Sequence, residues 1–86
     1  MQIKTNGNEV TINGESTMIT SKSMTILKLL LKTDGVVEIQ ALKDATRIVS
    51  THTMRQHVST LRIALRAING PTIVTHFTVG YEIKEL

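Results

Sequence analysis

Polar and apolar residues alternate near the N-terminus of the chain, as they do in a half-buried strand. The alternation is clearest in EVTI at 9–12. Asn-Gly pairs at 6–7 and 13–14 flank this segment and supply the positive-φ residues that two-residue hairpin turns need. STMI at 16–19 follows as a third strand. We therefore predict a small antiparallel sheet over residues 1–19.

The pattern changes to a helical period in the middle of the chain. After a candidate N-cap at Thr20 or Ser21, leucines recur at helical spacing until the Asp-Gly pair at 34–35 ends the helix. Ser50 or Thr51 offers the N-cap of a longer helix further on. The predicted helices, which together form a core over 20–68, lie at about 22–33, 39–46 and 51–68.

The segment TIVTHFTVGYEI at 72–83 is rich in β-branched and aromatic residues and predicts a closing hairpin. The run Asn-Gly-Pro at 69–71 ends the last helix, and Gly80 is the expected turn or bulge residue. A chain of 86 residues is long enough for one domain and too short for two. We expect a single α+β domain over 1–86 that closes with a hairpin at 69–86.

The last predicted helix has one apolar face and one basic face. Its apolar residues fall within about 80° of one another on a helical wheel, which predicts a core stripe. The stripe consists of Met54, Val58, Leu61, Leu65 and Ile68. About 100° round the wheel lies a second group, which consists of Arg55, Arg62, Arg66 and Ser59. The face turned away from the core is completed by His52, Gln56, Thr60 and Ile63.

Positive charge is concentrated in the same part of the chain. The formal net charge is +3, but residues 43–66 carry five basic residues against Asp44 alone, a local net charge of +4. No acidic residue lies between Asp44 and Glu82, although an exposed helix usually pairs acids with bases. An unpaired arginine row beside Gln, Ser and Thr suits phosphate oxygens and base edges. The alternative is that these arginines only keep a small domain in solution.

Four segments resemble the DNA-binding domain of the OmpR/PhoB family of winged helix-turn-helix regulators. In chain order they are ITSKSMTILKLLL at 19–31, DGVVEIQAL at 34–42, HTMRQHVSTLRIAL at 52–65 and THFTVGYE at 75–82. The residues shared with the family's recognition helix are Thr53, His57, Leu61, Arg62 and Leu65. Those shared with its wing are Thr75, Gly80 and Tyr81. The resemblance implies a winged helix-turn-helix fold with a small N-terminal sheet, three helices and a C-terminal hairpin wing.

The resemblance also implies how DNA is bound. The helix at 51–68 would enter the major groove, and the wing at 72–84 would lie near a neighbouring minor groove. Arg62 and His52 occupy positions where family members commonly hold arginines near phosphate, and Thr75 stands where a contact to the DNA backbone is expected. The predicted DNA-binding residues are His52, Thr53, Arg55, Gln56, Ser59, Thr60, Arg62, Arg66, Thr75, His76 and Phe77.

The chain departs from the family pattern at several places. Phe77 stands where the family has the arginine that enters the minor groove, and Thr78 follows it in place of glycine. Phe77 is expected either to wedge against sugars or bases or to pack back under the hairpin. Ser59 and Thr60 replace a basic pair, so the grip on phosphate should be weaker than is usual in the family.

The loop before the recognition helix is also shortened, and it lacks the family's tryptophan. Because this loop can touch RNA polymerase in the family, we expect a repressor or an architectural factor rather than an activator. We also expect a free-standing domain without the family's receiver domain. One copy with few phosphate contacts should bind weakly, so two or more copies on adjacent sites are expected.

The sequence has no pattern typical of an enzyme, a metal site or a membrane protein. It lacks cysteine, and His52 and His57 lie about 140° apart on a helix and cannot share one ion locally. It has neither a nucleophile elbow nor a glycine loop for phosphate. No signal peptide is evident, and MTILKLLL at 24–31 is too short to span a bilayer. We expect a cytoplasmic, nucleoid-associated, non-enzymatic protein without a cofactor, metal, membrane partner or small-molecule substrate.

The leading hypothesis from the sequence is a sequence-specific regulator of transcription that binds double-stranded DNA. The alternative is a winged-helix module for protein–protein interaction that has lost DNA binding. Phe77 in the wing, Ser59 and Thr60 in place of basic residues, and an exposed Ile63 favour the alternative. The two hypotheses differ in salt dependence, since binding to DNA weakens steeply as salt rises.

Overall fold

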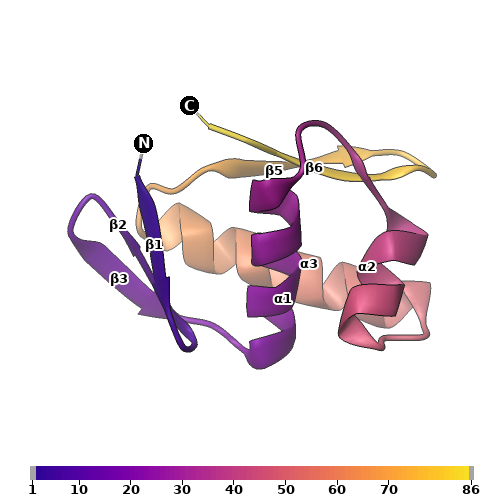
Figure 1. Ribbon diagram of the computed structural model, residues 1–86, viewed down its shortest axis with the longest axis horizontal. Helices are drawn as coiled ribbons and strands as arrows, with labels where there is room; N and C mark the ends of the chain where they lie inside the picture. The colour runs from indigo at the N-terminus through magenta and orange to yellow at the C-terminus, as the bar shows by residue number, and fades with distance from the viewer. Residues whose placement is uncertain (1, 86) are drawn as a thin grey trace.

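The computed structural model describes residues 2–85, in which two small sheets flank three helices (Figure 1). The N-terminal sheet is antiparallel, with strand order β1-β2-β3. Its strands are β1 (Ile3–Asn6), β2 (Glu9–Ile12) and β3 (Glu15–Met18). The alternation predicted for β2 is confirmed, because Val10 and Ile12 are buried. The third strand begins one residue earlier than the predicted 16–19.

The two hairpin turns of this sheet differ from each other. Asn13 (φ 51°) and Gly14 (φ 85°) form the predicted positive-φ pair between β2 and β3. The prediction for the first turn is wrong, because Asn6 is still paired in β1 and the turn residues are Gly7 and Asn8. Gly7 alone has a positive φ there (59°), as a type II′ turn requires at its first central position.

Helix α1 (Ser21–Lys32) begins after Thr20, one of the two predicted N-caps. The Thr20 hydroxyl oxygen accepts a hydrogen bond from the backbone N–H of Ser23 (3.1 Å). The helix ends at Lys32, close to the predicted Asp-Gly stop. The apolar residues that α1 buries are Met24, Ile26, Leu27 and Leu30.

Ser23→Ala is expected to raise the free energy of unfolding by about 1 kcal/mol, which raises Tm by roughly 4–8 °C. The Ser23 side chain is buried, and its hydroxyl has no hydrogen-bond partner within residues 2–85. A buried unpaired hydroxyl is destabilising relative to a methyl group. Thermal unfolding followed by circular dichroism measures the change, and Ser59→Ala on an exposed helix position controls for helix propensity. A Tm below that of the wild type would contradict this explanation.

The second and third helices form the helix-turn-helix. Helix α2 (Ile39–Thr46) and helix α3 (Thr51–Ala67) are joined by the short turn at 47–50. Ser50 is the N-cap of α3, because its hydroxyl oxygen accepts a hydrogen bond from the backbone N–H of Thr53 (3.3 Å). Both helices match the predicted ranges to within one residue.

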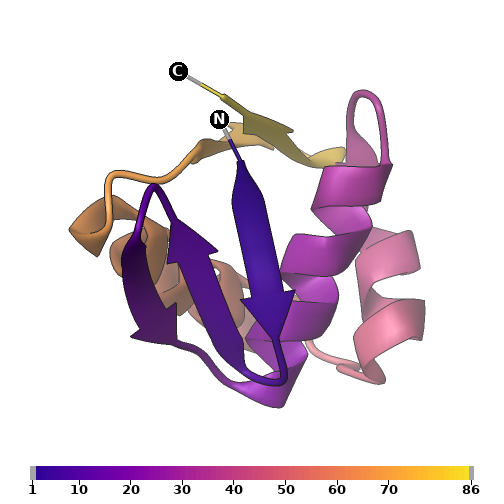
Figure 2. The same cartoon turned by 60° about the vertical axis from the view of Figure 1, so that its left-hand side comes forward.

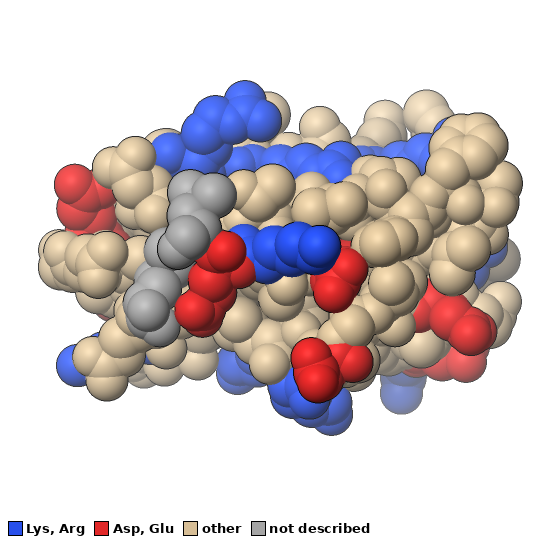
Figure 3. All heavy atoms as spheres, turned by 90° about the horizontal axis from the view of Figure 1, so that it is seen from above, with Lys and Arg blue, Asp and Glu red and all other residues tan. Residues whose placement is uncertain are grey.

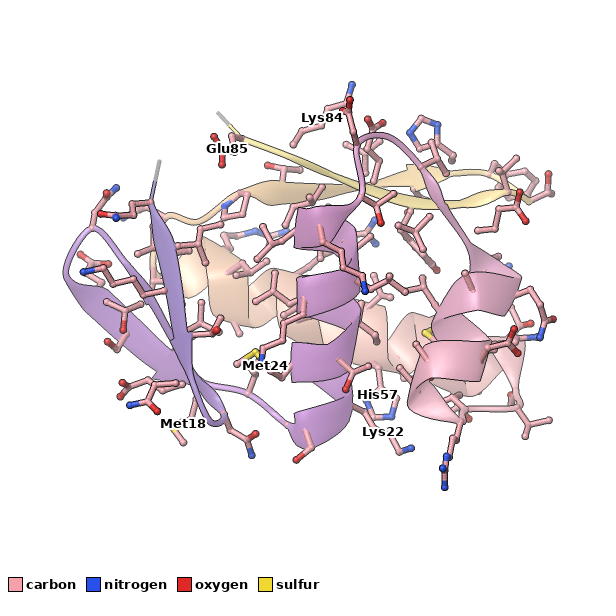
Figure 4. All side chains as sticks on the ribbon, in the orientation of Figure 1. Met18, Lys22, Met24, His57, Lys84 and Glu85 are labelled. Atoms are coloured by element: carbon pink, nitrogen blue, oxygen red, sulfur yellow. The ribbon has the colours of Figure 1, made fainter. Side chains whose placement is uncertain are left out.

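Side chains from two elements satisfy the C-terminal end of α2. The buried Thr46 hydroxyl donates to the carbonyl oxygen of Leu42 (2.7 Å) and accepts from the backbone N–H of Ile48 (3.3 Å). Lys22 lies at the start of α1 (Figure 4), and its Nζ donates to the carbonyl oxygen of Thr46 (2.7 Å). A cation at this place also interacts favourably with the helix dipole. These contacts fix the chain where it turns from α2 into α3.

The core lies between the helices and extends beneath both sheets. In two views α1 lies between the N-terminal sheet and α2 (Figures 1 and 2). The predicted core stripe of α3 is confirmed, since Met54, Val58, Leu61, Leu65 and Ile68 are all buried. His57 beside this stripe is half-buried. Within residues 2–85 no helix has the length and apolar character needed to cross a membrane.

The second sheet contains the wing and a strand from before α2. Its order is β4-β6-β5, with β4 (Val37–Glu38), β5 (Thr72–His76) and β6 (Gly80–Lys84). Gly80 does not occupy a positive-φ turn, which corrects the role predicted for it. It is instead the first residue of β6, where the backbone of β4 passes so close that a Cβ atom would have no space. The wing is thereby joined to the chain just before α2.

Candidate nucleic-acid interface

The outward face of α3 carries most of the predicted DNA-binding side chains. The exposed ones are His52, Arg55, Gln56, Ser59, Thr60 and Arg66, and Ile63 on the same helix is exposed as well. Thr53 is half-buried in the first turn. The Thr60 hydroxyl donates to the carbonyl oxygen of Gln56 (3.0 Å), so its oxygen remains available as an acceptor.

Within residues 2–85, the arginines of α3 have no acidic partner. Arg55, Arg62 and Arg66 form no ion pair with any residue in the described range 2–85. Seen from the side of β5 and β6, Lys and Arg side chains form a band along the edge where α3 lies (Figure 3). No acidic side chain interrupts the band in that view. The chain thus presents a continuous cationic edge beside its wing.

Arg62 connects α3 to the wing. Its Nε donates to the carbonyl oxygen of Ile73 (3.0 Å), and its terminal NH2 group donates to the Thr75 hydroxyl oxygen. Its guanidinium carbon lies 5.7 Å from the centroid of the Tyr81 ring, within the range of a cation–π contact. One side chain therefore contacts both strands of the wing. The sequence placed Arg62 near phosphate but did not reveal this connection, because its partners lie 11 and 13 residues further along the chain.

A small hollow lies between the end of α3 and the beginning of β5. It encloses about 160 Å³ and is lined by Arg62, Arg66, Pro71, Thr72 and Ile73. Guanidinium and hydroxyl groups are the donors that proteins direct at phosphate oxygens. The hollow lies on the same side of the molecule as the cationic edge, and its lining suits a phosphate of a nucleic-acid backbone.

The wing carries the remaining predicted residues. Thr75 is exposed, and its hydroxyl already accepts the hydrogen bond from Arg62. His76 is half-buried, and its Nε2 atom lies 2.8 Å from a carboxylate oxygen of Glu82 across the hairpin. The sequence does not reveal this pairing. Phe77 is 81 % exposed, so the alternative that it packs back under the hairpin is wrong.

The turn at the tip of the wing holds a β-branched residue in the left-handed region. The backbone N–H of Val79 donates to the carbonyl oxygen of His76 (2.9 Å), which closes the turn. Its third residue, Thr78, has a φ of 62°. This is the position where a type II turn favours glycine, and where the resemblance also placed a glycine.

Thr78→Gly is expected to stabilise the fold by on the order of 0.5–1 kcal/mol. Glycine removes the steric penalty of a left-handed L-residue but loses more backbone entropy on folding. Urea unfolding measures the change as a higher midpoint at an unchanged slope. Thr78→Val, which keeps the β-branch, should bring no gain, and equal midpoints for the two variants would contradict the assignment of strain.

Within the part of the chain that the structure describes, no group of three or more His, Cys, Asp or Glu residues is placed to hold a metal ion. The chemical capacity of this surface is that of hydrogen-bond donors and cations arrayed on a helix and a hairpin.

Comparison with known proteins identifies the fold. No protein-family model and no curated protein matches the sequence. Among solved structures, the chain is similar to the C-terminal domain of the nisin resistance regulator NsrR, a lantibiotic response regulator. The TM-score is 0.85 at 18% identity, and the match covers 98% of this chain and 93% of that one. The α+β winged-helix architecture implied by the OmpR/PhoB resemblance is confirmed: the chain has the fold of a response-regulator C-terminal domain.

Proposed function

We propose that this chain is a sequence-specific regulator of transcription that binds double-stranded DNA in the cytoplasm. In this proposal α3 enters the major groove, and the β5–β6 wing lies over the adjacent minor groove. Arg55, Arg66 and the hollow beside Arg66 hold phosphates, while Gln56 and Ser59 reach base edges.

One observation carries this proposal. The exposed face of α3 combines arginines that lack acidic partners within residues 2–85 with short hydrogen-bonding side chains, on a winged-helix fold. A helix that serves only solubility usually alternates acids with bases. The absence of acids along α3 leaves its positive potential free to attract a polyanion.

The proposal extends to the mode of regulation. With few cations on the interface, one copy should bind weakly, and two copies on adjacent sites would reach useful affinity. The resemblance suggests a head-to-tail arrangement on direct repeats. The shortened loop before α3 favours a repressor or an architectural role over activation.

Arg55→Ala/Arg66→Ala is expected to weaken binding to DNA about tenfold or more, because each charge-assisted contact to phosphate contributes on the order of 1 kcal/mol. Fluorescence anisotropy of a labelled random-sequence duplex, titrated at several salt concentrations, measures the affinity. The slope of log affinity against log salt should fall by about two.

The matched control is Lys4→Ala/Lys28→Ala, which removes the same charge from exposed positions on β1 and α1. It should leave the slope close to that of the wild type. Equal losses in the two double variants would show that net charge, and not the α3 face, governs binding.

A second candidate function is binding to another protein. Ile63 is 63 % exposed on α3, and Val49 is 87 % exposed just before it. Exposed apolar surface is one feature of the sites at which proteins bind other proteins. This candidate is favoured if a captured partner protein stays bound at high salt while the chain binds no duplex DNA at low salt.

A further inference from the structure

The tip of the wing presents an aromatic ring to solvent. Phe77 is the one phenylalanine of the sequence, and it is 81 % exposed. Val79, two residues on, is 51 % exposed and enlarges the apolar surface. The only other aromatic residue of the chain, Tyr81, is buried. Of the two aromatic rings in the wing, the wholly apolar one is therefore exposed to solvent and does not pack in the core.

The structure ties the wing to the helices on both sides of Phe77. On one side of it, Thr75 accepts a hydrogen bond from Arg62 of α3. On the other side, the carbonyl oxygen of Val79 accepts a hydrogen bond from the backbone N–H of Ile39 at the start of α2 (3.1 Å). Phe77 thus lies between two points at which the wing is tied to the helix-turn-helix. The backbone that carries Phe77 is therefore held in place relative to α2 and α3.

The surroundings of the ring favour a polyanion over an apolar protein surface. The wing lies beside the cationic edge formed by α3, which has no acidic residue (Figure 3). Thr75, Thr78 and the half-buried His76 next to Phe77 are polar, so they suit sugars and phosphates. An apolar side chain that projects from a polar and cationic surface matches the chemistry of a groove in which bases lie between two phosphate chains.

We propose that Phe77 enters the minor groove as a wedge between neighbouring base pairs, and that the chain thereby bends its DNA. This inference rests on the proposed function. Apolar side chains inserted at a base step partly unstack it and kink the duplex toward the major groove. Such insertion is easiest at flexible pyrimidine–purine steps such as TpA. The tip of the wing, residues 76–80, carries no Lys or Arg and so lacks the side chains that favour a narrow A-tract groove.

The test measures unstacking and binding separately on one duplex. The wild-type chain first selects a duplex from a random pool, and 2-aminopurine then replaces one adenine at a time in the selected sequence. Fluorescence of 2-aminopurine reports unstacking, energy transfer between dyes at the two ends reports bending, and anisotropy reports affinity. The variants are Phe77→Ala, Phe77→Leu and Phe77→Arg, with Met18→Ala as the control, because Met18 is an exposed apolar residue (67 % exposed) on β3, outside the proposed interface.

With the wild type, 2-aminopurine fluorescence should rise severalfold at one pyrimidine–purine step, and end-to-end energy transfer should increase. Phe77→Ala should abolish both changes and weaken binding about threefold to tenfold, whereas Phe77→Leu should keep part of each. Phe77→Arg should bind without unstacking, and Met18→Ala should match the wild type.

Two results would overturn the inference. If Phe77→Ala or Phe77→Arg binds with the same unstacking and bending as the wild type, the wedge is wrong and the proposed function stands. If the wild type selects and binds no duplex at low salt, the wedge and the proposed function both fail.

Discussion

Gly80→Ala is expected to lower the free energy of unfolding by about 3 kcal/mol or more. A Cβ atom at residue 80 would lie 1.9 Å from the carbonyl oxygen of Val37 and 2.9 Å from the Cα atom of Glu38. Both atoms belong to the backbone of β4, which cannot swing aside as a flexible side chain does. Relief of the overlap therefore requires β4 to separate from β6. Since small domains are marginally stable, much of the protein should be unfolded at 37 °C.

Urea unfolding followed by far-UV circular dichroism measures this loss. Gly7→Ala is the matched control, because a Cβ atom there meets nothing within 4 Å and only the positive φ opposes alanine. The control should cost about 1 kcal/mol. If Gly80→Ala costs no more than Gly7→Ala, the close approach of β4 does not explain the glycine.

Arg62→Ala is expected to cost about 2 kcal/mol of stability in addition to weakening DNA binding. The substitution removes a charged donor from the Ile73 carbonyl oxygen, a hydrogen bond to Thr75 and the contact with the Tyr81 ring. Hydrogen bonds to charged groups each contribute roughly 1.5–3 kcal/mol, and partial exposure of Arg62 reduces this value. The wing should become more mobile relative to α3.

Thermal unfolding separates this structural role from the loss of charge. Arg66→Ala, one turn later on α3, removes an exposed arginine whose side chain makes no hydrogen bond within residues 2–85, and it should change stability by less than about 0.5 kcal/mol. Arg62→Lys should not restore the wild-type Tm, because an ammonium group lacks the planar fork. Equal Tm values for Arg62→Ala and Arg66→Ala would show that the connection to the wing is not stabilising.

The sequence predicted those elements whose causes are local. The leucine period and the caps at Thr20 and Ser50 define the helices, and the pair Asn13-Gly14 defines a hairpin turn. The predicted position of the first turn is wrong by one residue, because an Asn-Gly pair is compatible with two arrangements. Both residues can occupy the centre of a turn, or Asn can end the strand and Gly can begin the turn. Pairing between strands decides between these arrangements, and pairing is not visible in a window of a few residues.

The features of the proposed interface that the sequence did not predict depend on contacts between distant segments. The sequence predicts Gly80 in a turn, because glycine is favoured both where φ is positive and where another backbone passes too close for a Cβ atom. Only the position of β4 in the folded chain distinguishes these two reasons. The family resemblance predicts that Arg62 contacts phosphate. Its contacts to β5 depend on how the wing packs against α3, which the resemblance does not show. The two alternatives for Phe77 were separated only by its exposure in the folded chain.

The most direct test of the proposed interface is a titration of the 15N-labelled chain with duplex DNA, followed by the backbone amide signals. We expect the largest shifts along α3 and at the wing, residues 51–67 and 72–80, and small shifts in β1 and β2. That result would place the duplex against the face that carries Arg55, Arg66 and Phe77. Shifts concentrated on the N-terminal sheet, or no shifts at low salt, would contradict the account.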